Sequence, residues 1–312
     1  MFLKTYLGKK VNIKFLFSEK SIFIPTCLLI LGGISYGSIF SANKMAIEAG
    51  FPFMAYTFWQ ILISAAILLL LSIITRQLPK INFINVRVFS LVAVTGLLGP
   101  LLVITSVATK LPPGVITLGA GLIPVVTYIL ALSVKADRIR ALSIGGVLVG
   151  FGSVLLIILP SESLPIQGSW IWVIFLLLMP FSASLNNVFG AMLRPSEEGS
   201  IPMTAGMMII AAILLFIISW SYDGLYSITE AGLEGIIAVL WASAAVTITY
   251  TCFFEIIRRA SGLFFAQINY LIVAAGLFWA WIIFGESLSS WVWGAVALLI
   301  LSLTLMNIGM AK

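Results

Sequence analysis

Residues 32–52 read GGISYGSIFSANKMAIEAGFP, and this stretch joins an apolar, small-residue-rich segment to a pair of charges. Lys44 and Glu48 stand one helical turn apart at the edge of the apolar segment, and Pro52 follows one turn later. The pattern recurs 150 residues further along the chain, as Arg194-x-x-x-Glu198-x-x-x-Pro202. The stretch therefore looks like the end of a membrane span and also like one half of an internal repeat.

The composition places the whole chain in a bilayer. Hydrophobic residues make up 61% of its 312 residues, charged residues only 9%, and the mean hydropathy is +1.17. Soluble domains carry about 25% charged residues, so one globule of this size could not bury so much apolar surface. The chain has no histidine, which excludes imidazole metal sites and proton relays, and Cys27 and Cys252 lie in apolar runs. We expect an all-α polytopic membrane protein that has no metal, no cofactor and no enzymatic activity.

A spanning helix needs about 20 mostly apolar residues, and that window predicts ten spans. They are Ile22–Met45, Tyr56–Ile74, Arg87–Thr109, Val115–Val134, Arg140–Leu159, Trp170–Leu193, Pro202–Trp220, Leu233–Ile257, Ser261–Phe284 and Trp291–Met310.

The basic residues predict the orientation of these spans. With the N-terminus in the cytoplasm, every one of the 17 lysines and arginines except Lys44 and Lys110 falls on the cytoplasmic side. Cytoplasmic loops carry such an excess. We therefore expect both termini in the cytoplasm, a basic N-terminal tail over residues 1–21, an uncleaved first span and residence in the cell (inner) membrane. The net charge of +6 then reflects topology and not binding to nucleic acid.

The repeat divides the chain into residues 22–159 and 166–310, with five predicted spans in each. Besides the opening pattern, AAILLL at 65–70 matches AAILLF at 211–216. Because five is odd, the second repeat must enter the membrane from the opposite side. Inverted repeats of this kind are a recurring plan of secondary transporters, with the substrate site near the midplane where the repeats meet.

Three stretches resemble a known family. They are Tyr36-Gly37-Ser38 followed by Lys44, LPPGVITL at 111–118 followed by Pro124, and FGESL at 284–288 before Trp291 and Gly294. On these residues the chain resembles the EamA type of the drug/metabolite transporter superfamily over about residues 22–310. The resemblance implies ten spans, cytoplasmic termini and transport of a small solute. The chain departs from the family pattern at KADRI, 135–139, and at Gln60, where the family often carries an arginine.

Polar residues deep in a span are costly, so they mark candidate sites. Asn186 and Asn187 lie in the sixth span and match Tyr36 and Gly37 of the first span through the repeat. Further candidates are Gln267, Asn269, Tyr270 and Trp241. Two interpretations stay open at each position: the side chain lines a substrate cavity, or it only bonds one helix to another.

The remaining candidates concern motion. Pro100, Pro124 and Pro180 interrupt spans three, four and six and are candidate hinges, although a static bend is the alternative. Lys44 and its repeat partner Arg194 are either snorkelling anchors or a pair of gate charges, one for each side of the membrane. A small-residue stripe at Gly145-Gly146-x-x-x-Gly150-x-Gly152 predicts either packing within the chain or a homodimer face.

These observations predict a secondary transporter that uses alternating access to move, in the export direction, a small metabolite such as an amino acid. A drug or hydrophobic-cation exporter is the alternative, because aromatic side chains could stack on a cation. A membrane scaffold has less support, since the sequence offers no soluble domain. No aspartate or glutamate stands at the middle of a predicted span, so proton coupling has no obvious carrier there.

Overall fold

A computed structural model describes residues 23–160, 164, 168–190, 199–222, 226–259 and 267–311. Over these ranges all regular structure is helical, and no strand occurs in them. Nine helical segments of this part are long and apolar enough to cross a membrane, and Ile268–Phe284 is a shorter apolar helix. The predicted all-α, ten-helix fold is confirmed. The N-terminal tail at 1–21 lies outside the described residues.

In the first half of the chain the predicted third and fourth spans are each built from more than one helical segment. The elements are α1 (Phe23–Glu48), α2 (Phe53–Ile74), α3 (Phe83–Val92), the π-helical η3 (Ala93–Leu98), α4 (Gly99–Val107), α5 (Pro113–Gly121), α6 (Ile123–Ser133) and α7 (Ala141–Ile158). The third span begins earlier than the predicted Arg87, because the side chain of Asn82 accepts a hydrogen bond from the Asn85 amide (2.8 Å) and caps α3.

The second half again supplies five spans, but among its described residues the interrupted span is the first and not the third. Its elements are α8 (Trp170–Leu176), α9 (Leu178–Leu185), the π-helical η4 (Asn186–Gly190), α11 (Ser200–Tyr222), the 3₁₀ turn η5 (Ile228–Ala231), α12 (Gly232–Arg259), α14 (Ile268–Phe284) and α15 (Ser290–Ala311). The predicted end of the sixth span at 191–193, Arg194, and the predicted start of the ninth at 261–266 lie outside the described residues.

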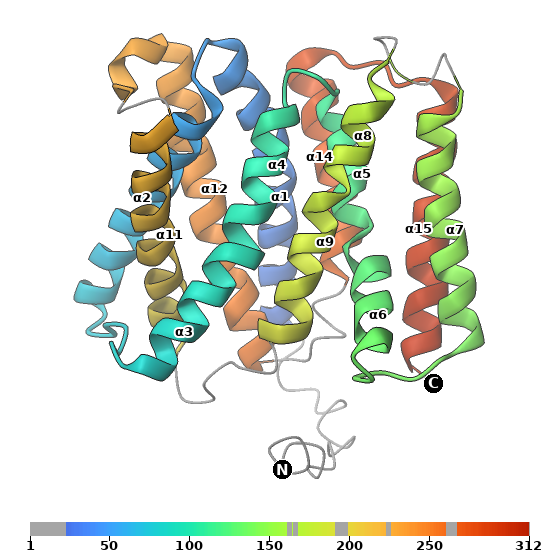
Figure 1. Cartoon of the computed structure of the whole chain (residues 1–312), viewed down its shortest axis with the longest axis horizontal. Helices are drawn as coiled ribbons and strands as arrows, with labels where there is room; N and C mark the ends of the chain where they lie inside the picture. Colours follow the sequence, from blue (N-terminus) through green and yellow to red (C-terminus); the bar gives the residue numbers. More distant parts are fainter. Residues whose placement is uncertain are drawn as a thin grey trace.

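The two halves exchange their first helices. The first helix of the chain, α1, packs against α12 and α14, which are the third and fourth spans of the second repeat. In the same way α9 packs against α4 and α6, from the third and fourth spans of the first repeat. The pairs α2–α11 and α7–α15 flank this centre on its two sides (Figure 1). Each repeat therefore supplies a helix that packs among the helices of the other repeat.

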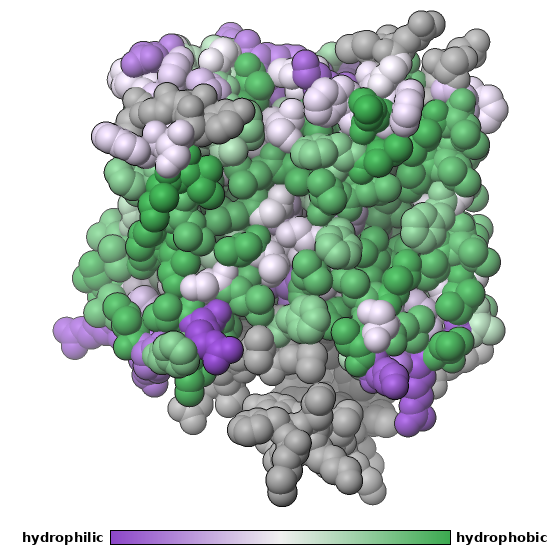
Figure 2. All heavy atoms as spheres, viewed as in Figure 1, coloured by the Kyte–Doolittle hydropathy of each residue, from purple (hydrophilic) through white to green (hydrophobic). Residues whose placement is uncertain are grey.

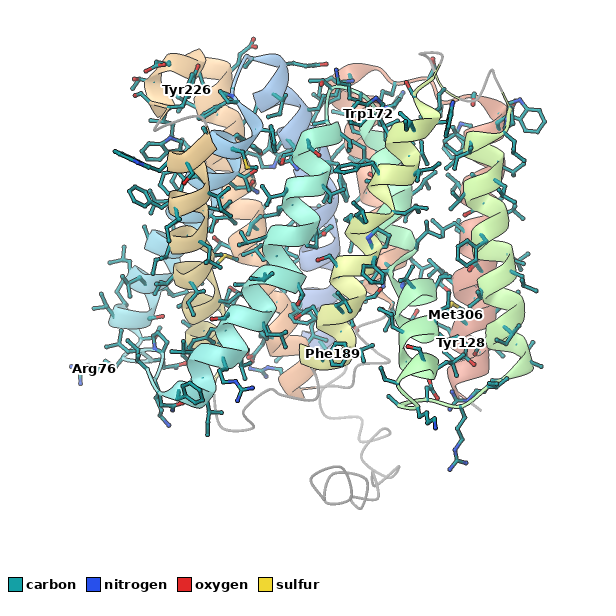
Figure 3. All side chains as sticks on the ribbon, in the orientation of Figure 1. Arg76, Tyr128, Trp172, Phe189, Tyr226 and Met306 are labelled. Atoms are coloured by element: carbon teal, nitrogen blue, oxygen red, sulfur yellow. The ribbon has the colours of Figure 1, made fainter. Side chains whose placement is uncertain are left out.

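Two ends of the bundle can be named from the chain. We call the end where α1 begins and α15 finishes the proximal end, and the other the distal end (Figure 1). Figure 2 shows a hydrophobic waist between two hydrophilic ends. In Figure 3, Arg76 lies at the proximal end, whereas Trp172 and Tyr226 lie at the distal end. The waist is what a bilayer-spanning protein requires.

Glycines set the closest helix contacts. A Cβ added at Gly37 of α1 would lie 2.7 Å from the backbone nitrogen of Gly276 in α14. A Cβ at Gly146 of α7 would lie 2.6 Å from Cγ of Met306 in α15, whereas one at Gly145 would meet nothing within 4 Å. Part of the small-residue stripe in α7 is therefore used for packing within the chain, and a homodimer stays a prediction.

Each candidate hinge proline follows an interruption of its helix. The π-helical η3 ends directly before Gly99-Pro100, α5 gives way to α6 before Pro124, and α8 gives way to α9 before Pro180. Proline has no backbone N–H and its ring clashes with the carbonyl four residues earlier, so the regular hydrogen-bond ladder ends there. The bends are features of the structure, and their use as hinges stays a prediction.

Candidate functional site

The centre of the bundle is organised around Tyr36, in the middle of α1. Its half-buried ring meets Phe40 edge-on, with 5.6 Å between ring centroids. The ring packs against both of the large apolar clusters of the protein, so it lies where these clusters meet. The sequence-predicted position of Tyr36 at the repeat interface agrees with this placement, although its role in binding stays a prediction.

Both π-helical segments come together beside this point. The hydroxyl of Tyr250 donates to the carbonyl oxygen of Gly96 in η3. A Cβ at Gly96 would lie 2.6 Å from Cγ of Asn186 in η4, so the Asn186 amide sits directly on this glycine. Oδ1 of Asn186 is buried and has no hydrogen-bond partner in the described part of the chain. Single turns of π-helix are frequent at functional sites because they free backbone groups from the helical ladder.

Asn187 is directed elsewhere. Its Nδ2 donates to Oγ1 of Thr127 on α6 (3.2 Å), and the Thr127 hydroxyl donates to Oγ of Ser184 (3.0 Å). Ser184 in turn donates to the carbonyl of Ile123 (3.0 Å). This chain of hydrogen bonds ties η4 and α9 to α6, which is the interhelical interpretation considered for Asn187. The two adjacent asparagines therefore serve different contacts.

The remaining candidates, Gln267, Asn269 and Tyr270, lie at the start of α14. Tyr270 lines a pocket of about 600 Å³ between α14 and α15, and its hydroxyl accepts a hydrogen bond from Nδ2 of Asn307 (3.1 Å). Gln267 is half-buried just before the helix begins, and Asn269 is buried. Whether either residue lines a substrate cavity stays a prediction.

Trp241 belongs to a polar group in the distal half that the sequence reasoning mostly missed. Its Nε1 donates to Oγ of Ser38 on α1 (3.1 Å), and its ring meets that of Trp279 with 5.3 Å between centroids. Nearby, the hydroxyl of Tyr56 on α2 donates to Oδ1 of Asn43 on α1 (2.7 Å). Asn43 was visible in the sequence as a polar residue on the Tyr36 face of α1, but its partner on α2 was not.

Lys44 lies at the distal end of α1 and contacts three side chains. Its Nζ lies 3.6 Å from Oε1 of Glu286, 3.9 Å from Oε1 of Glu48 and 4.4 Å from the centroid of the Phe284 ring. The lysine side chain is 19% exposed and that of Glu286 only 12%. A snorkelling lysine would hold its ammonium in water. Lys44 lies on α1 against the loop that joins α14 to α15, and its role as an anchor or as a gate charge stays a prediction.

Glu286 extends this link to a third element. Its Oε2 accepts a hydrogen bond from the backbone nitrogen of Gly114 (3.2 Å), in the first turn of α5. Free N–H groups at the start of a helix favour a carboxylate. The motif residues of LPPG and FGESL are thus in direct contact. We call Lys44, Glu286 and Gly114 the distal latch. It joins both repeats, whereas Arg194, the proposed counterpart of Lys44, lies outside the described residues.

The environment of Glu286 also affects its protonation. Burial raises the pKa of this carboxyl above its ordinary value, while the Gly114 amide and Lys44 oppose the rise and Glu48 adds to it. The folded protein therefore holds a proton on Glu286 at a pH where the unfolded chain has lost it. By linkage, the stability contributed by the protonated carboxyl is present at low pH and is lost as the pH rises through the raised pKa.

This sign gives a testable pH dependence. Relative to Glu286→Gln, which imitates the protonated acid, the melting temperature of the wild-type protein should fall as the pH is raised from about 4.5 towards neutrality. Thermal unfolding of both proteins in detergent at several pH values measures the difference. Glu230→Gln, at an exposed acid of η5, is the matched control and should show no such trend. A wild-type protein that gained stability with pH would show that the Lys44 ion pair outweighs burial.

The whole chain is similar to a known protein family and, in fold, to a solved structure. A family model described as the EamA-like transporter family matches twice, over residues 24–159 and 170–308. A solved structure titled only as the crystal structure of a protein superposes with a TM-score of 0.61 at 17% sequence identity, covering 90% of this chain and 96% of that one. At this identity the likeness concerns the fold alone. No curated protein matches the sequence.

Proposed function

Since the chain belongs to the EamA-like transporter family, we propose that it exports a small metabolite, such as an amino acid or a related solute, by alternating access and without ATP. The observation that carries this proposal is the exchange of first helices: α1 packs on α12 and α14 as α9 packs on α4 and α6. Two halves related in this way can adopt two mirror arrangements, one open to each side of the membrane. The multi-pass fold itself is established, and the substrate, direction and mechanism are the proposal.

The polar groups between the halves support a solute that needs hydrogen bonds. Around Tyr36 they are phenols, amides, hydroxyls and backbone carbonyls, such as those of Tyr250, Asn186 and Gly96. Neutral donors and acceptors can orient a polar solute, and they bind it less tightly than an oppositely charged side chain would. The distal latch then acts as one gate, closed in this conformation. We place the protein in the cell membrane with the proximal end in the cytoplasm.

A second candidate, export of a hydrophobic cation, is favoured by the aromatic rings near the centre. Tyr36 and Phe40 meet edge-on, and so do Trp241 and Trp279. Ring faces attract cations, and they do so more strongly away from water. This candidate shares the pathway with the first and differs in the class of solute, so one assay separates the two.

Flux from reconstituted vesicles tests both. Proteoliposomes are loaded with an equimolar mixture of the twenty common amino acids and with tetraphenylphosphonium, and the external medium is sampled by mass spectrometry. We expect one or a few amino acids to leave at least about tenfold faster than from protein-free vesicles, with saturation at high concentration. Selective release of tetraphenylphosphonium would favour the cation exporter. Release of neither would contradict both candidates.

A further inference from the structure

One face of α2 carries a row of polar residues that points at the middle of the bundle. Tyr56 reaches Asn43 on α1, and the hydroxyls of Thr57 and Thr105 on α4 lie 3.2 Å apart. On α2, Gln60 lies four residues after Tyr56 and three residues after Thr57. Residues at such spacings share a helix face. The side chain of Gln60 is therefore directed between α1 and α4, inside the bundle and not towards lipid.

The backbone around Gln60 is fixed by the second repeat. Oγ of Ser243 on α12 donates to the carbonyl of Gln60 (3.0 Å), and Oγ of Ser64 donates to the carbonyl of Ser243 (3.0 Å). These reciprocal bonds join α2 to α12. Gln60 thus stands at the contact between the two repeats, where alternating access places a solute.

The Gln60 amide itself has no partner. The residue is fully buried, yet neither Oε1 nor Nε2 makes a hydrogen bond within the described part of the chain. On α1, Asn43 accepts from Tyr56 with its Oδ1, while among the described residues neither its Nδ2 nor Oγ of Ser41 has a hydrogen-bond partner. Buried polar side chains are nearly always hydrogen-bonded, and each unpaired group costs about 1–3 kcal/mol. The unpaired amide groups of Gln60, one turn after Tyr56, and of Asn43, which Tyr56 contacts, therefore mark a candidate ligand site.

The chemistry of the row defines the ligand. Gln60 and Asn43 offer unpaired N–H donors, and Gln60 also offers an unpaired carbonyl acceptor. None of these side chains carries a charge, and the nearest lysine of α1, Lys44, is engaged by Glu286. A solute with a net charge would lose its hydration here without finding a counter-charge. A carboxylate can accept from the amide N–H groups, and an ammonium can donate to the amide oxygen.

We propose that Gln60 and Asn43 form a hydrogen-bonding site for the transported solute, and that this site selects solutes without net charge, such as zwitterionic α-amino acids. This inference rests on the transport function proposed above. It adds the class of solute and names a residue of α2 that decides the selectivity.

The test is Gln60→Met, which keeps the length of the side chain and removes both amide atoms. Because the amide is unpaired in the empty protein, this variant should unfold at the same temperature as wild type or at a higher one. In the vesicle assay, efflux of the neutral amino acids should fall at least about tenfold. Ser72→Ala, which removes another buried, unpaired hydroxyl from α2, is the matched control and should keep wild-type flux.

The outcomes separate this inference from the function it rests on. If wild-type vesicles release no amino acid, the proposed function fails and the inference fails with it. If wild-type vesicles release neutral amino acids and Gln60→Met releases them equally well, only the inference is overturned. It is also overturned if Gln60→Met lowers the melting temperature by several degrees relative to Ser72→Ala, because the amide would then have a structural partner. Preferential wild-type release of lysine or glutamate would overturn the selectivity for uncharged solutes.

Discussion

Gly37→Val is expected to leave little or no folded protein. The Cβ of any residue at this position would lie 2.7 Å from both the backbone nitrogen of Gly276 and the Cβ of Ala275 in α14. A backbone atom cannot rotate away as a side chain can, so α1 and α14 would have to separate. Overpacking of a well-packed core costs about 1–3 kcal/mol, and more where backbone must move. Because two packed helices must separate here, the cost should exceed that range and consume most of the 5–15 kcal/mol by which folded proteins are typically stable.

Size-exclusion chromatography of a fluorescent fusion measures this effect as the yield of monodisperse protein. Gly145→Val, on α7, is the control, because a Cβ there meets nothing within 4 Å and both changes put the same side chain in a helix. If Gly145→Val gives a normal yield and Gly37→Val gives almost none, the loss of folded protein comes from the contact between α1 and α14. Normal yield of both would show that this contact is looser than described.

The largest effect on transport is expected from reversal of one charge in the distal latch. Lys44→Glu would place a carboxylate among Glu286 and Glu48 and remove the ammonium that now lies 3.6 Å from Glu286. Removing one partner of a buried pair leaves the other uncompensated, which costs about 3–5 kcal/mol for full burial and less for this partly exposed pair. The distal latch should lose that stabilisation, and flux should fall at least about tenfold.

The double variant Lys44→Glu with Glu286→Lys tests whether the pair itself matters. It restores opposite charges across the two repeats, so flux should return to within about threefold of wild type. Lys110→Glu reverses an exposed lysine between α4 and α5, near the Trp172 ring, and should leave flux unchanged. Equal loss in the single and double variants would show that Lys44 acts through something other than Glu286. Full flux in Lys44→Glu would leave the lysine as an anchor.

Local sequence signals predicted the helices well and their partners poorly. Apolar windows located every span, and Pro124 and Pro180 marked real interruptions, because both signals depend on the chain within one or two turns. Lys44 and Glu286 are far apart in sequence. That they form an ion pair follows only from the packing of α1 against α14 and the loop after it. Likewise, the adjacent residues Asn186 and Asn187 read as one cluster, but π-helical geometry sends them to different neighbours.

The partnerless amide of Gln60 shows a further limit. In the sequence, Gln60 was one polar residue in an apolar span, and whether its amide was paired depended on α1, α4 and α12 together. Tertiary packing decides which buried polar groups find hydrogen-bond partners, and the periodicity of a sequence does not show it.

The exchange of first helices also has a consequence for biogenesis. Helix α1 leaves the ribosome first, but its partners α12 and α14 are made more than half a chain later, and the bond from Trp241 to Ser38 spans 203 residues. Contacts of such long range form late. Until α12 is inserted, Ser38 of α1 lacks its Trp241 partner, whereas Asn43 can already meet Tyr56 of α2. The nascent first repeat is therefore an incomplete molecule, vulnerable to quality control until the second repeat arrives.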